Sequence, residues 1–144
     1  MTAVKDVLDE KGRDIYSIAP DASVYEALKL MAENDIASLV VLENGNFVGI
    51  MSERLYAREI VLKGRTSLGT FVREIMSTRV LYARPDQSVQ ECMAVMTAKG
   101  VRHLPVLQDD ELLGLVSIGD MVKSVIGDQT FTIEQYEHYI HGDR

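Results

Sequence analysis

Residues 20–31, PDASVYEALKLM, return 65 positions later as PDQSVQECMAVM at residues 85–96. The register continues without a gap, because IASLVVLENGNFVGIMSE at 36–53 falls on VRHLPVLQDDELLGLVSI at 101–118. Eleven positions between residues 20 and 56 are identical to their counterparts. Repetition on this scale indicates that one structural unit is present twice, and it decides the fold.

Both copies carry the same predicted elements, in the order β-α-β-β-α. The repetition starts further upstream, since VKDVL at 4–8 resembles VREIM at 72–76 at an offset of 68, which gives the first copy three extra residues. A short extended segment follows in each copy, at 15–19 and at 80–84, and runs into the turn signal Pro-Asp.

The first helix of each copy begins at a serine that a glutamate follows three residues later, Ser23 with Glu26 and Ser88 with Glu91. This pattern is a capping box, in which the serine side chain accepts an early backbone N–H and the glutamate reaches back to the serine. Apolar residues beyond it recur at the i, i+3, i+4 and i+7 spacing of one buried helical face. They are Val24, Ala27, Leu28 and Met31 in the first copy and Val89, Cys92, Met93 and Met96 in the second.

Two β-rich runs come next in each copy, separated by Asn44-Gly45 and by Asp109-Asp110. Asn-Gly favours the tight turn that joins a hairpin. A second helix then ends each copy, from about 53 to 63 and from about 118 to 126. The predicted C-caps of these helices are Gly64 and Gly127.

A unit of about 60 residues buries too little surface to be stable alone. We therefore expect an α+β fold in which the two repeats pack into one module with pseudo-twofold symmetry. Thr132-x-x-Gln135 resembles a further capping box and predicts a last helix over 130–141. The predicted boundaries are 4–64 for the first repeat, 65–79 for the linker and the entry to the second repeat, 80–127 for the second repeat and 128–144 for the C-terminal helix and tail.

The composition is that of a globular domain, and from the length of 144 residues we expect no separate catalytic domain. Of the 144 residues, 47% are hydrophobic and 26% are charged, which argues against disorder. The net charge of −7 disfavours nucleic acid as a partner, because such binding needs a basic surface. No run approaches the ~20 apolar residues of a membrane span, and the N-terminus lacks the apolar core of a signal peptide. With Cys92 as the single cysteine, we expect a cytoplasmic protein that has no membrane partner.

Basic side chains gather in two stretches of this acidic chain. Either they form an ordinary solvated surface, or they create a local site for a small anion. The two groups are Arg54, Arg58, Lys63 and Arg65, and then Lys99, Arg102 and His103.

The second copy holds the stretches GVRHLPV at 100–106 and GLVSIGD at 114–120. Together with the duplicated β-α-β-β-α unit, they resemble a tandem pair of cystathionine-β-synthase-type (CBS) domains, also called a Bateman module. The resemblance covers residues 4 to about 126, and the whole chain is similar to stand-alone bacterial CBS-pair proteins of the signal-transduction type. It implies a regulatory module that binds adenosine ligands in clefts between the repeats and catalyses nothing itself.

The resemblance also implies roles for residues in a cleft of the second repeat. Asp120 would hold the ribose hydroxyls, Ser117 would meet the phosphate, and the pair Arg102 and His103 would balance the phosphate charge. The segment 80–84 would flank the adenine. The full predicted set for this second cleft is Val80, Tyr82, Ala83, Arg102, His103, Leu104, Pro105, Ser117 and Asp120.

A first cleft is expected to bind more weakly. Leu55 stands where the second copy has Asp120, and Ala37 and Ser38 stand where it has Arg102 and His103. A leucine cannot accept hydrogen bonds from ribose hydroxyls, although Arg54 can return one phosphate contact. The predicted residues of the first cleft are Tyr16, Ile18, Ala37, Ser38, Ser52 and Arg54.

The function that follows from the resemblance is reversible binding of an adenine nucleotide, which senses energy or redox state and regulates a partner protein that the sequence does not name. AMP is the leading ligand, with ATP, ADP and NAD(H) as the others, and S-adenosylmethionine ranks lower because it has no phosphate for Arg102. A homodimer is expected, built through methionine-rich helices. The rival function is a dimerisation or scaffold module whose clefts stay empty.

Ser117-x-x-Asp120 has a purely structural interpretation as well, since its spacing is that of a capping box. Ser117, His103 and Asp120 could also be taken for a hydrolytic triad, but nothing in the sequence marks a nucleophile elbow or an oxyanion loop.

Two further features favour a structural interpretation. His138 and His141 could bind a metal from the last helix, but no further ligands accompany them, so no metal site is expected. Cys92 replaces Ala27 of the first copy on a buried helical face, which favours a structural thiol over a redox sensor.

Overall fold

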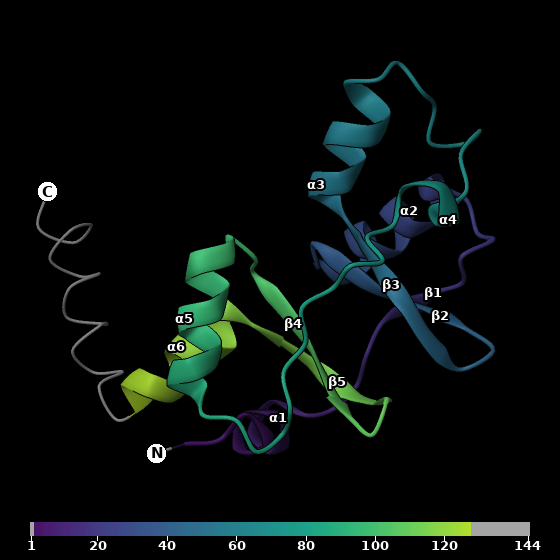
Figure 1. The fold of residues 1–144 in the computed structure, drawn as a ribbon. Coiled ribbons are helices and arrows are strands. Elements are labelled where there is room, and N and C mark those ends of the chain that lie inside the picture. Colours follow the sequence, from purple (N-terminus) through teal and green to yellow (C-terminus); the bar gives the residue numbers. More distant parts are fainter. Residues whose placement is uncertain (1, 128–144) are drawn as a thin grey trace, which may run out of the picture.

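The computed structural model describes residues 2–127 of the chain, so the helix predicted over 130–141 lies outside the described residues. The described part forms two lobes, each with a small β-sheet and its own helices (Figure 1). The lobes meet along one strand of each sheet. This is the predicted α+β arrangement of two repeats.

The first sheet has three strands in the order β1-β2-β3, and the second is the pair β4-β5. β1 (Ser17–Ile18) runs parallel to β2 (Ser38–Glu43), which pairs antiparallel with β3 (Asn46–Ser52). In the second lobe β4 (His103–Gln108) pairs antiparallel with β5 (Glu111–Ser117). β3 and β5 contact each other, and Figure 1 shows them side by side where the lobes join.

The helices follow the repeat as well. α2 (Val24–Asn34) and α5 (Val89–Lys99) are the first helices of the two copies, and each buries the predicted apolar face. After β5 comes α6 (Ile118–Ile126), with Gly127 as its C-cap as predicted. After β3 comes α3 (Glu53–Tyr56), which continues as the π-helix η1 (Ala57–Val61). The helix predicted to reach residue 63 therefore ends at Val61 and changes its hydrogen-bond pattern on the way.

The short helices at the start of the two copies are exchanged between the lobes. α1 (Val4–Lys11) precedes the first sheet in sequence, yet Val4, Val7 and Leu8 belong to the core of the second lobe. α4 (Val72–Ile75) precedes the second sheet, yet Val72 and Ile75 belong to the core of the first lobe. Each hydrophobic core is thus completed by a segment from the other copy, which ties the lobes together.

The two early extended segments are shorter than predicted. In the first copy only Ser17 and Ile18 form a strand of the predicted 15–19. In the second copy the predicted 80–84 provides a single parallel bridge, Ala83 with Val106. Gly64 has a positive φ of 67°, but it lies beyond the helix end and Leu62 is the C-cap.

The hairpin turns are as the sequence predicts. Asn44 and Gly45 have φ values of 53° and 81°, and Asp109 and Asp110 have 51° and 65°. Positive φ at both central residues is the type I′ geometry that matches the twist of a two-residue hairpin. Glycine adopts this conformation without steric cost, and Asn and Asp tolerate it better than other residues do.

The predicted capping boxes are half confirmed. The Ser23 hydroxyl accepts the Glu26 N–H at 3.0 Å, and the Ser88 hydroxyl accepts the Glu91 N–H at 3.1 Å. Within residues 2–127, neither glutamate returns a bond to its serine. The reciprocal pair is Ser117 with Asp120, described below.

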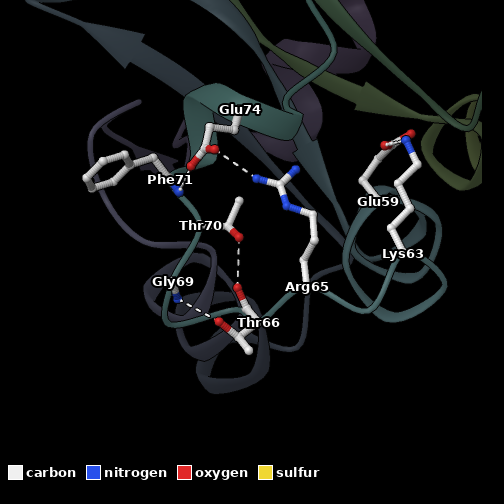
Figure 2. A network of polar contacts seen from close by, with 8 residues as sticks. All are labelled: Glu59, Lys63, Arg65, Thr66, Gly69, Thr70, Phe71 and Glu74. Carbon is white, nitrogen blue, oxygen red and sulfur yellow. Dashed lines mark hydrogen bonds and ion pairs between the residues drawn. The ribbon is translucent and has the colours of Figure 1, made fainter.

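A polar network fixes the linker between the copies (Figure 2). The Arg65 guanidinium contacts the Glu74 carboxylate at 2.8 Å, and the other oxygen of Glu74 accepts the Phe71 N–H at 2.7 Å. The buried Thr70 hydroxyl donates to the Thr66 carbonyl at 2.8 Å. These bonds hold α4 against the first lobe. They therefore fix the position from which the linker after α4 begins.

Candidate functional site

A cavity of about 670 Å³ opens where the two copies meet. Three parts of the chain line it: the start of β2 and the end of β3 with α3 and η1, the linker after α4, and the turn from α5 into β4. The lining residues are Ala37, Ser38, Ile50, Ser52, Glu53, Arg54, Leu55, Arg58, Ser77, Arg79, Val80, Leu81, Lys99, Gly100, Val101, Arg102 and His103.

Backbone pairing brings these stretches together. Antiparallel pairing of β2 with β3 sets Ser38 opposite Ser52, whose hydroxyl caps α3 by accepting the Leu55 N–H at 3.2 Å. The linker joins the edge of β3 through Ser77 and Ile50, which exchange two backbone hydrogen bonds of 3.0 and 2.9 Å. This bridge carries Arg79 and Val80 over the cavity.

The second copy contributes the opposite wall. α5 ends at Gly100, whose left-handed conformation (φ 66°) turns the chain toward β4 and presents Arg102 and His103. Arg54 of the first copy donates from Nη1 to the Gly100 carbonyl at 3.5 Å, a long bond that spans the cavity between the copies.

The cavity has an apolar floor and a basic rim. Its half-buried aliphatic side chains are Ile50, Leu55, Val80 and Val101. Its exposed cations are Arg54, Arg58, Arg79, Lys99 and Arg102, and Glu53 is its only carboxylate among the lining residues.

Among the described residues, the rim cations form no ion pair with a carboxylate. Residues 2–127 hold fourteen lysines and arginines, fifteen less Arg144. Six of the fourteen form ion pairs: Lys11, Arg13, Lys63, Arg65, Arg73 and Arg84. Five of the remaining eight line this one cavity. In a chain with a net charge of −7, most of the cations without an ion pair among residues 2–127 therefore gather here, which is the arrangement that attracts an anion.

One buried polar atom in the lining lacks a partner. Ser38 is 6% exposed, and within the described residues its hydroxyl oxygen makes no hydrogen bond. Buried hydroxyls without a partner are uncommon, because each forfeits the hydrogen bonds it would make to water.

The structure groups the predicted site residues differently from the sequence analysis. The cavity combines three residues expected in the second cleft with four expected in the first, because the wall of each copy faces the other copy. Those that line it are Val80, Arg102, His103, Ala37, Ser38, Ser52 and Arg54. Those that do not are Tyr16, Ile18, Tyr82, Ala83, Leu104, Pro105, Ser117 and Asp120.

The residues outside the cavity have other surroundings. Tyr16 and Tyr82 are about half exposed, at 50% and 55%. Ile18 packs against the first core, while Ala83 and Leu104 belong to the second. Pro105 is buried within β4, where its carbonyl accepts the Ala83 N–H at 2.9 Å.

Ser117 and Asp120 form the reciprocal capping box at the start of α6. The Asp120 N–H donates to the Ser117 hydroxyl at 3.0 Å, and the Ser117 N–H donates to Oδ2 of Asp120 at 2.8 Å. The same Oδ2 accepts a hydrogen bond from Nζ of Lys11 at 2.6 Å, and Lys11 also donates to the Leu115 carbonyl at 2.9 Å. In this state the carboxylate predicted to hold a ribose is therefore engaged by the chain itself.

These contacts set the ionisation of the two groups beside α6. Burial works to raise the pKa of Asp120, but hydrogen bonds from Lys11 and Ser117 outweigh it and hold the pKa below the usual carboxyl value. Burial lowers the pKa of the His103 imidazole below its usual 6.5, and the charges of Lys11 and Arg102 lower it further against the opposing pull of Asp120. At neutral pH the rim therefore carries its charge on arginine and lysine rather than on His103.

Three rim cations were not among the predicted site residues. Arg58 and Lys99 stand in the two basic stretches of the sequence, whereas Lys63 and Arg65 from the first stretch form ion pairs elsewhere. Arg79 had no signal of its own.

Other motifs of the sequence have structural roles. The hydroxyl of Ser117 serves as a helix cap, as the capping-box pattern predicts. Cys92 is 3% exposed within a core, and burial raises the pKa of its thiol, so it packs as a small apolar side chain. His138 and His141 lie outside the described residues. Residues 2–127 contain no group of three His, Cys, Asp or Glu that could hold a metal ion.

A family model for the CBS domain matches the chain twice, at residues 4–61 and at residues 72–127. Together the two matches span most of the sequence. The chain belongs to the CBS-domain family. It is 33% identical over 150 residues to the CBS domain-containing protein CBSX3, mitochondrial, of Arabidopsis thaliana, an alignment that covers 98% of this chain and 73% of that protein.

Solved CBS structures share the fold. A protein with CBS domains from Burkholderia ambifaria is 50% identical with a TM-score of 0.85, over 89% of this chain and 96% of that one. The CBS domain pair of protein MJ0100, solved with 5′-methylthioadenosine and S-adenosyl-L-methionine, has a TM-score of 0.76 over 89% of this chain and 98% of that one. At 24% identity the second likeness shows the fold alone.

A CBS pair is a regulatory module. Among residues 2–127 no helix is both long enough and apolar enough to cross a membrane.

Proposed function

We propose that this protein is a sensor that binds an adenine nucleotide in the cavity between its two CBS repeats and passes the state of that site to a partner protein. The observation that carries the proposal is the set of five unpaired cations around an apolar floor. A nucleotide has the complementary division, with a flat apolar base at one end and phosphates at the other.

The size and chemistry of the cavity support this choice. Small-molecule sites are typically ~300–1,000 Å³ and mostly apolar with a few placed polar groups, and this cavity measures about 670 Å³. The guanidinium groups of Arg54 and Arg102 suit phosphate oxygens, which they can meet through two parallel hydrogen bonds. AMP, ADP, ATP and NAD(H) all carry the required phosphate, whereas S-adenosylmethionine has none.

We assign the main ligand to this cavity rather than to a site around Asp120. Arg102 and His103 line the cavity with Ser52 and Arg54, whereas the neighbouring Ser117 and Asp120 do not. Meanwhile Asp120 is held by Lys11. A ligand that needed Oδ2 of Asp120 would compete with Lys11 and with the Ser117 N–H for that oxygen.

The regulatory mechanism would be a shift in the balance between two packings of the lobes. A phosphate between Arg54 or Arg58 of the first copy and Lys99 or Arg102 of the second favours the packing that brings them together. A ligand moves such a balance only by as much as it binds one state better than the other.

A thermal-shift screen tests the proposal. At ~100 times its dissociation constant, a ligand adds about 2.7 kcal/mol to the unfolding free energy, which corresponds to several degrees for a chain of this size. AMP, ADP, ATP, NAD or NADH should raise the melting temperature, and Arg54→Ala with Arg102→Ala should abolish the rise. Lys29→Ala is the matched control, because Lys29 is an exposed cation outside the cavity and forms no ion pair among the described residues. Absence of any shift at millimolar nucleotide would exclude the proposal.

The rival function, a dimerisation module with empty clefts, also has an observation in its favour. Both lobes expose large apolar side chains on or beside their helices, including Leu62 at 79% and Val125 at 50%. Extraction of the purified protein and analysis of the released small molecules separates the two. Adenine nucleotide in the extract supports the sensor, whereas a module with empty clefts would release none.

A further inference from the structure

Ser38 is the first residue of β2, and the structure gives its hydroxyl no partner among the described residues. The residue is 6% exposed and its hydroxyl oxygen is buried. The hydroxyl neither donates a hydrogen bond to a described atom nor accepts one from it. Its counterpart 65 residues later is His103, the first residue of β4, so equivalent strand ends of the two copies line one cavity.

An isolated buried hydroxyl costs the protein stability, because it has given up its bonds to water and gained none in return. Such groups are rare in folded proteins and call for a specific explanation at each site. A structural role does not explain Ser38, because no hydrogen bond inside the described residues depends on its side chain. Because Ser38 lines the cavity, a ligand bound there can provide the missing hydrogen-bond partner.

The burial of the lining indicates which part of the ligand Ser38 meets. The cations at the rim are exposed. Ser38 is the most buried lining residue, and the floor also contains the half-buried side chains of Ile50 and Leu55. The phosphates of a nucleotide therefore belong at the rim and its base on the floor. A nucleobase has apolar ring faces, which suit the aliphatic floor, and polar atoms along its edge, which can form hydrogen bonds.

We propose that Ser38 determines base recognition, with its hydroxyl forming a hydrogen bond to a polar atom on the edge of the bound base. This inference rests on the proposed function and assigns recognition of the nucleotide's base to Ser38. The oxygen is covered in the ligand-free state, so the contact requires rotation about the Cα–Cβ bond, for which serine has three staggered positions.

The proposal predicts effects of opposite sign on stability and on binding. In Ser38→Ala the unsatisfied hydroxyl is gone, so the melting temperature of the ligand-free protein should stay the same or rise. The affinity for ATP should fall about 3- to 10-fold, the range for loss of one hydrogen bond to an uncharged group. The affinity for inorganic tripolyphosphate, which has no base, should not change.

Calorimetric titration of ATP and of tripolyphosphate into the wild type, Ser38→Ala and Ser124→Ala tests these effects, with melting curves of the ligand-free proteins. Ser124 is a partly buried serine of α6 outside the cavity lining, so the same substitution there serves as the matched control. Unchanged ATP affinity in Ser38→Ala would overturn the inference. An equal loss for ATP and tripolyphosphate would overturn the assignment to the base, and a lowered melting temperature would show that Ser38 is structural. If the wild type bound neither ligand, the proposed function itself would fail, and the inference with it.

Discussion

At the scale of single residues, two glycines at equivalent positions show how the copies interlock. A Cβ added to Gly49 would lie 2.7 Å from the Ser77 carbonyl oxygen, and one added to Gly114 would lie 2.7 Å from Cδ2 of Leu8. Ser77 belongs to the linker and Leu8 to α1, the two segments that cross between the lobes. The repeat alignment shows that both positions are glycine. It does not show why glycine is needed there, because only the fold shows which atoms approach these positions.

The ion pair between Lys11 and Asp120 gives a residue-scale prediction on pH. The pKa of Asp120 is lowered in the folded protein, so its ionised form contributes stability above the ordinary carboxyl pKa of 3.8, and that contribution is lost as the pH falls through the folded value. Lys11→Met should therefore lower the unfolding free energy near pH 7 by on the order of 1 kcal/mol or less, since the pair is partly exposed. Urea unfolding at a series of pH values measures the difference.

The wild type and Lys11→Met should differ by a constant amount between about pH 7 and pH 5, and the difference should shrink below about pH 4. Lys5→Met is the control, because Lys5 lies on the same helix and forms no ion pair among the described residues. A difference that grew toward low pH would contradict the assigned sign.

At the scale of elements, the sequence predicted what depends on local chemistry. Type I′ turns at Asn44-Gly45 and Asp109-Asp110, serine caps, and the apolar faces of α2 and α5 follow from neighbouring residues, and the structure confirms them. The change from α3 to the π-helix η1 did not appear in the pattern, because an i, i+3, i+4 spacing of apolar residues does not fix the hydrogen-bond register.

The exchange of α1 and α4 between the lobes was also not predictable from the repeat. An alignment assigns each segment to the copy it precedes, whereas packing depends on where the connecting chain leads. The cavity follows the same rule, since Arg102 and Ser52 come from different copies and meet only after folding. Residue identities at the candidate site were therefore partly predictable, but their grouping was not.

The exchange itself can be tested through Leu8, which is fully buried in the core of the second lobe. Leu8→Ala should cost about 2–5 kcal/mol of unfolding free energy, the usual range for such a cavity in a core. Hydrogen exchange should place the lost protection in α5, α6, β4 and β5 rather than in the first sheet. Loss confined to the first lobe would show that α1 packs with its own copy.

At the scale of the whole molecule, apolar helix surfaces favour a second copy of the chain as partner. Of the methionines expected to supply this surface, Met31, Met51, Met96 and Met121 are fully buried, and Met76 and Met93 are half-buried. Six of the eleven exposed large apolar side chains among the described residues lie on or beside α2, η1, α5 and α6. They are Tyr25, Val61 and Leu62 in the first lobe and Val95, Val122 and Val125 in the second.

A homodimer through these helices should scatter light with a mass near twice the 16.1 kDa of one chain at micromolar concentration. Leu62→Asp combined with Val125→Asp should return a monomer, because a charge buried at an apolar interface is costly. Leu81→Asp, which adds the same charge at an exposed leucine on the linker, is the control and should leave the dimer intact. A wild type that remains at 16.1 kDa would refute the dimer.

We expect the ligand to bind between the copies, at the basic rim, and not around Asp120. Calorimetric titration of ATP into the wild type, Arg102→Ala and Asp120→Ala tests it most directly. One strong site per chain is expected, weakened about tenfold or more in Arg102→Ala by the loss of a charge-assisted contact, and little changed in Asp120→Ala. Binding that survives in Arg102→Ala and disappears in Asp120→Ala would contradict it.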